Sequence, residues 1–117
     1  MNRSARLTAA AALVALPPLA FAHHGWGGFD VNKPLDHRGT VTESSFSNPH
    51  GLVKSLRDGK ELTFELAPVS RMETRGLTAA DIAPGKSVRL YGYRNNGVPT
   101  LYRAEWIEIA GRRIELR

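Results

Sequence analysis

Alternation of apolar and polar residues indicates that most of the chain forms short β-strands. The clearest case is the segment 61–66, in which Leu62, Phe64 and Leu66 share one face. The pair Asp58-Gly59 directly before it is typical of a tight hairpin turn. Six segments have strand patterns: 38–46, 52–56, 61–66, 87–93, 100–109 and 112–116. Six inward positions are expected to share one core: Leu62, Phe64, Leu66, Val88, Leu90 and Ile107.

The segment between the third and fourth strands carries helical signals instead. Residues 70–73, Ser-Arg-Met-Glu, have the spacing of a capping box, and Gly76 is placed to end that helix. Residues 78–81 repeat the signal for one more turn. Three strands, a short helical segment and two or three further strands follow the order of the Greek-key barrel called the OB-fold. We therefore expect a mainly all-β protein, a five- to six-stranded antiparallel OB-like barrel, with a small open β-roll as the alternative.

The first 22 residues have the form of a secretory signal. Arg3 and Arg6 precede an apolar run over 7–19, and Ala20-Phe21-Ala22 provides small residues for cleavage. A membrane anchor is the alternative, but this run is shorter than the roughly 20 apolar residues that cross a bilayer. We therefore expect cleavage after Ala22 and a periplasmic protein without a membrane anchor.

The expected organisation is a signal peptide over 1–22, an extended arm rich in glycine and aromatic residues over 23–35, and one barrel domain over 36–117. The formal net charge of +5 falls to +3 when Arg3 and Arg6 are removed, since 5 − 2 = 3. Nucleic acid is therefore not an expected partner. The chain has no Cys, which excludes disulfides, thiolate metal sites and a Cys nucleophile.

Several motifs resemble those of a family of short exported bacterial proteins of unassigned function. They are His23-His24-Gly25-Trp26, Asn48-Pro49-His50-Gly51, and the Pro-x-Ser-Arg-Met-x-x-Arg-Gly-Leu motif over residues 68–77. The resemblance implies export and a small OB-like barrel. It brings no catalytic residue and no activity with it.

Histidines are the candidate metal ligands. Cleavage after Ala22 would give His23 both a free α-amine and an imidazole, with His24 beside it, and His50 follows in a loop. Nitrogen ligands bind Cu(II) most tightly among the divalent first-row ions, so copper is the expected metal, and His37 is a less plausible ligand. Zinc is less expected because Cys is absent. The alternative is that the paired histidines are solvated and that His50 belongs only to a turn.

Arg71 and Arg75 are candidate anion-binding residues, because their i, i+4 spacing places both on one helical face. The favoured interpretation is structural: the arginines pair with glutamates of the barrel and fix the helix across its open end. Trp26 is a candidate for docking the aromatic arm on a larger exported partner. Packing of this ring against the barrel explains it equally well.

Enzyme signatures are absent from the sequence. It has no nucleophile-elbow motif, no phosphate-binding glycine loop and no His-Glu-x-x-His. The expected role is therefore that of an exported, non-enzymatic binding or accessory protein, with copper or another transition metal as the leading ligand. A protein-interaction module is the second hypothesis. An oligonucleotide or oligosaccharide binder is the third.

Overall fold

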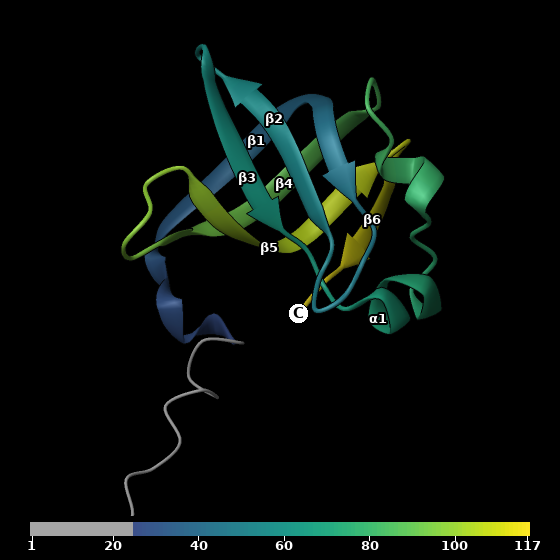
Figure 1. The fold of residues 1–117 in the computed structure, drawn as a ribbon, viewed down its shortest axis with the longest axis horizontal. Helices are drawn as coiled ribbons and strands as arrows, with labels where there is room; N and C mark the ends of the chain where they lie inside the picture. The colour runs from purple at the N-terminus through teal and green to yellow at the C-terminus, as the bar shows by residue number, and fades with distance from the viewer. Residues whose placement is uncertain (1–24) are drawn as a thin grey trace, which may run out of the picture.

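The computed structural model describes residues 25–117, which form a mainly β structure (Figure 1). Its elements are η2 (Trp26–Gly28), β1 (Phe29–Ser45), β2 (Leu52–Arg57), β3 (Lys60–Glu65), α1 (Val69–Thr74), η3 (Ala79–Ile82), β4 (Ser87–Asn95), β5 (Leu101–Ile109) and β6 (Arg112–Glu115). The predicted fold class is confirmed, because the short helix lies between β3 and β4 of a small antiparallel sheet. Within residues 25–117, no helix has the length and apolar character needed to cross a membrane.

The strands close into a ring. The sheet has the order β3-β2-β1-β4-β5-β6, and an additional parallel pairing joins β3 to β5. Five strands therefore form a closed ring, and β6 extends the sheet beyond it from β5. The parallel seam aligns Phe64 with Tyr102 and Glu65 with Arg103. Closure removes the exposed edges that an open meander would leave on β3 and β5.

Strand β1 is longer than expected, since it begins at Phe29 rather than near Arg38. It pairs with β4 along its first part and with β2 along its last part. Its register shifts between Asp30 and Pro34, and a proline cannot donate a ladder hydrogen bond. This irregularity disrupts the alternation by which a strand is recognised. Residues 29–35, which were expected to belong to an extended arm, therefore have no clear strand pattern in the sequence but are part of β1 in the structure.

The core lies inside the ring. Each of the six inward positions predicted from the alternation is buried: Leu62, Phe64, Leu66, Val88, Leu90 and Ile107. Met72 of α1 and Leu77 are also fully buried, which places the helical segment over the core (Figure 1). His37, which directly precedes the predicted first strand, lies within β1 and is only 1% exposed.

Helix α1 begins at Val69, one residue before the predicted cap Ser70. The predicted capping box over 70–73 is wrong, because Pro68 occupies the cap position and makes no side-chain cap. Asn48 from the β1–β2 loop instead accepts the Val69 N–H through Oδ1 at 3.0 Å. The second signal is confirmed, since the Thr78 N–H and hydroxyl both donate to Asp81 Oδ2, at 2.9 and 3.0 Å.

Candidate functional site

His50 lies in the loop between β1 and β2, after a cis peptide bond between Asn48 and Pro49. Its Nε2 is 3.6 Å from Glu65 Oε2, and the two side chains are 22% and 18% exposed. Its Nδ1 is buried and has no hydrogen-bond partner in the part of the chain that the structure describes. One ring nitrogen therefore faces a carboxylate, and the other is left without a partner.

Glu65 is held at the end of β3 by the parallel seam. Arg103, its neighbour across that seam, places Nη1 3.4 Å from the same Glu65 Oε2. Arg103 is only 5% exposed, and a buried guanidinium without a counter-charge would be strongly destabilising. Strand β4 also packs tightly against the backbone of Arg103 on β5. A Cβ at Gly92 would collide with the Arg103 carbonyl, so this close approach of the two strands requires glycine. Glu65 therefore has a fixed position between His50 and Arg103.

Trp26 packs beside this cluster. The guanidinium carbons of Arg103 and Arg117 lie 5.4 and 4.6 Å from the ring centroid of Trp26. The edge of the ring meets Tyr93, with 6.0 Å between centroids. Cation–π contacts of this kind stabilise by about 0.5–1 kcal/mol at exposed sites. The chain just after His24 is thus anchored on the arginine that holds Glu65.

His23 and His24 lie outside the described residues. Within residues 25–117, no three histidine, aspartate or glutamate side chains are grouped closely enough to hold a metal ion. A site that includes His50 therefore requires donors from the preceding segment. His37 is buried on β1, where its ring stacks on Phe64 at 5.5 Å and its Nε2 is bonded to Ser55. It is consequently not available as a ligand at the same site.

His37 and Ser55 form a serine–histidine pair that no sequence motif indicates. Their Nε2 and Oγ atoms are 2.9 Å apart, but Ser55 donates its hydroxyl proton to the Thr40 carbonyl at 2.9 Å. Ser55 is fully buried, and His37 Nδ1 has no acid beside it within residues 25–117. A nucleophile needs an accessible hydroxyl whose proton passes to the base. The pair is therefore a structural contact in the core.

Arg71 and Arg75 both contact the backbone of the C-terminal segment. Arg71 Nη1 donates to the Leu116 carbonyl at 3.1 Å. Arg75 Nη1 donates to the carbonyls of Glu115 and Arg117, at 2.8 and 3.0 Å. The expected pairing with glutamates of the barrel is not observed within residues 25–117, because the two guanidinium groups donate to backbone carbonyls of residues 115–117 instead. The two arginines tie α1 to the end of the sheet.

The aromatic residues of β4 and β5 are largely covered by the chain itself. Trp106 lies between Tyr91, stacked at 5.5 Å, and the Arg113 guanidinium, 3.8 Å from the ring centroid. The Tyr93 hydroxyl donates to Glu105, and this hydrogen bond raises the pKa of Tyr93 to about 12. Tyr93 therefore stays neutral at physiological pH. These contacts occupy part of the aromatic surface with groups of the chain itself.

The fold and this cluster together define a small, mainly β protein with a closed ring of five strands and a histidine–carboxylate–arginine group beside its parallel seam. The chain belongs to the family of unknown function (DUF6152), whose model matches residues 10–100. A comparison with curated proteins gives no match. Membership of this family assigns no activity, so the function is inferred from the geometry.

Proposed function

We propose that the mature protein begins at His23, is periplasmic, and binds a copper ion through His23, His24 and His50 as a binding or accessory protein. The observation that carries this proposal is the unpartnered, buried Nδ1 of His50. A buried polar atom without a partner is rare in folded proteins and costs free energy. A metal ion bound at Nδ1 would satisfy it.

Glu65 supports this role for His50. Histidines that bind metals usually direct their second ring nitrogen at a carboxylate, which fixes the ring orientation and makes the ligand more basic. Glu65 stands on the Nε2 side of His50 at 3.6 Å and is itself held by Arg103. His50 is thus oriented for binding through Nδ1.

The anchoring of Trp26 supports the participation of the amino-terminal histidines. His24 and His23 precede Trp26 by two and three residues, and an extended residue spans at most about 3.5 Å. Both histidines are therefore confined to roughly 10 Å of the Trp26 backbone. Trp26 contacts Arg103, which contacts the carboxylate beside His50. This series of contacts links the chain beside the amino-terminal histidines to the carboxylate at His50.

Copper fits this donor set better than zinc. An α-amine and an imidazole from one residue form a chelate of nitrogen ligands, which favours the tetragonal geometry of Cu(II). Structural zinc sites usually close with four protein ligands, often including Cys, and this chain has none.

Docking on an exported partner through Trp26 is the alternative function. Trp26 is half-buried, and two guanidinium groups of its own chain lie over its ring. A side chain that already packs in the free protein offers less new contact area to a partner. The geometry therefore supports an anchoring role for Trp26 more than a docking role.

Copper titration of the exported protein tests the proposal. The start at His23 is first verified by intact mass, and Cu(II) affinity is then measured by competition calorimetry. We expect His50→Ala to lower the affinity at least about tenfold. Glu65→Gln should lower it by a similar factor, because loss of the carboxylate that orients a metal-binding histidine weakens metal binding to that extent. Glu61→Gln, an exposed carboxylate on the same strand, is the matched control and leaves the affinity unchanged.

Two further arms of this experiment address the ligand set and the alternative. One added alanine before His23 displaces the α-amine and should weaken binding, while circular dichroism verifies that each variant is folded. Equal affinities of the wild type and His50→Ala, or an affinity no higher than that of a free His-His-Gly-Trp peptide, would refute the copper site. Loss of partner binding in Trp26→Ala but not in His50→Ala would favour the interaction module.

A further inference from the structure

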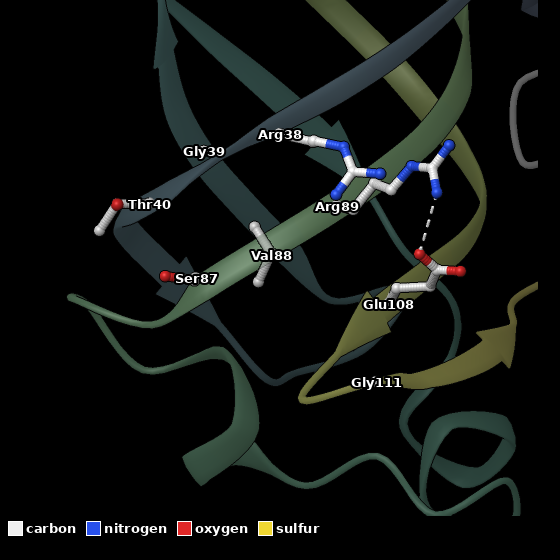
Figure 2. Close-up of a pocket in the computed structure, with 8 residues that line it drawn as sticks. All are labelled: Arg38, Gly39, Thr40, Ser87, Val88, Arg89, Glu108 and Gly111. Atoms are coloured by element: carbon white, nitrogen blue, oxygen red, sulfur yellow. Dashed lines mark hydrogen bonds and ion pairs between the residues drawn. The ribbon is translucent and has the colours of Figure 1, made fainter.

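A hollow of about 550 Å³ lies on the outer face of the sheet. None of the residues of the His50 cluster lines it. Its lining comes from β1, β4, β5 and the β5–β6 turn: Arg38, Gly39, Thr40, Ser87, Val88, Arg89, Glu108 and Gly111. Its volume is within the range of small-molecule pockets. Figure 2 shows Arg38 and Arg89 extending over the same face, with Glu108 meeting Arg89 from β5.

Charged side chains form a row across four strands at this hollow. Arg38 is opposite Arg89, Arg89 is opposite Glu108, and Glu108 is opposite Arg113. Two like charges directly opposite one another on neighbouring strands are destabilising. A negatively charged group near Arg38 and Arg89 would therefore reduce the repulsion between them.

Arg89 already has counter-charges. Its Nε and Nη2 donate to Asp36 at 2.9 and 2.7 Å, and its Nη1 donates to Glu108 at 3.3 Å. Arg38 forms no ion pair or hydrogen bond through its side chain within residues 25–117. The Arg89 side chain is thus held in place by its ion pairs. The guanidinium of Arg38 has no partner among the described residues and is available to a ligand.

The balance of charge indicates the valence of the ligand. The lining of the hollow carries two guanidinium groups, Arg38 and Arg89, and one carboxylate, Glu108, which leaves one positive charge. A ligand with one negative charge neutralises this excess. A phosphate dianion would add a second negative charge beside the carboxylate of Glu108.

Hydroxyl groups complete the lining. Thr40 and Ser87 are opposite one another on β1 and β4 and both line the hollow. Within the described part of the chain, neither hydroxyl has a side-chain hydrogen-bond partner. Each can donate to or accept from a polar ligand.

We propose that this hollow binds a small organic anion with a single carboxylate and further hydroxyl groups, the class to which sugar acids belong. Arg38 binds the carboxylate with its two-pronged guanidinium, and Thr40 and Ser87 bond to the ligand hydroxyls. Glu108 accepts from a ligand hydroxyl and disfavours dianions. This site is independent of the copper site and of its outcome.

Titration by nuclear magnetic resonance tests the proposal. Protein labelled with ¹⁵N, in the form that the cell produces, is titrated with D-glucuronate, D-glucose and inorganic phosphate. We expect saturable shifts of the Gly39 and Gly111 amide signals with glucuronate, which are absent with glucose and weaker with phosphate. Arg38→Gln should weaken glucuronate binding about tenfold or more, because a charge-assisted pair is lost.

The control is Arg94→Gln, which removes an equal charge from β4 outside the hollow and should leave binding unchanged. Arg38→Lys keeps the charge without the two-pronged geometry and should bind with intermediate affinity. Arg38 is exposed, so the amide spectrum of each variant should show a folded protein. Shifts that do not saturate, that persist in Arg38→Gln, or that are stronger with phosphate than with glucuronate would overturn the proposal.

Discussion

The imidazole of His37 and the hydroxyl of Ser55 form a hydrogen bond of 2.9 Å in the core, although 18 residues separate them in sequence. Ser55 uses its own proton on the Thr40 carbonyl, so His37 must donate from Nε2. Nδ1 is then unprotonated, buried and without a partner within residues 25–117. Protonation would place a charge in the core without an acceptor.

This contact predicts that acid destabilises the protein. Burial, aided by the charge of Arg57, lowers the pKa of His37 below its ordinary value of 6.5. The unfolded chain binds the proton more readily, so the stabilisation is present above about pH 6.5 and is lost as pH falls below it. We expect the free energy of unfolding to decrease between about pH 7.5 and 5, by at most ~1.4 kcal/mol per pH unit.

Urea unfolding at several pH values measures this dependence. His37→Gln retains a donor for Ser55 but does not titrate, and it should show a smaller slope in this range. Asp36 and Glu108 titrate below this range, because hydrogen bonds from Arg89 and Arg113 lower their pKa values below 3.8 and 4.5. Identical slopes for the wild type and His37→Gln would contradict the prediction.

Gly39 should tolerate no side chain, because of the same hydrogen bond. A Cβ at Gly39 would lie 2.6 Å from Ser55 Oγ and 2.7 Å from His37 Nε2. We expect Gly39→Ala to reduce the free energy of unfolding by about 1–3 kcal/mol through overpacking. Gly25→Ala is the matched control, since a Cβ there meets nothing within 4 Å. Equal stability of the two variants would show that β1 can shift freely at Gly39.

Phe64 is expected to be the most costly core residue to truncate. It is fully buried at the parallel seam, and its ring stacks between His37 and Tyr102 at 5.5 Å from each. Phe64→Ala should lower the free energy of unfolding by about 3–5 kcal/mol, measured by chemical denaturation. Leu56→Ala, on an exposed residue of β2, should change it little. A neutral effect at Phe64 would mean that the register of β3 is wrong.

Arg71 and Arg75 should act on the C-terminal segment rather than on ligand binding. Replacement of each by Met keeps the apolar stem and removes the bonds to the carbonyls of residues 115–117. We expect faster hydrogen exchange at the Leu116 amide, which donates to the Glu105 carbonyl at 2.8 Å. Copper affinity should not change. A loss of copper or glucuronate binding without faster exchange would instead assign these arginines a binding role.

The sequence by itself determined the strands and their inward faces wherever the signal was local. In β3, strict alternation places Leu62, Phe64 and Leu66 on one face, and a strand that buries one face permits no other pattern. The Asp58-Gly59 turn also depends only on adjacent residues, and both have the positive φ that such a turn requires. The order of these local elements was sufficient to predict the fold class. His50 was chosen as a candidate ligand from its loop position alone.

Only the tertiary structure decided which distant groups meet. Glu65 and Arg103 become neighbours because β3 and β5 close the ring, and 38 residues separate them in sequence. The start of α1 depends on Asn48 from another loop, and the burial of His37 depends on Ser55 across the sheet. Alternation records which face of a strand is apolar, but it carries no information on which strand lies beside it. These three pairings therefore followed from tertiary contacts and not from any local pattern.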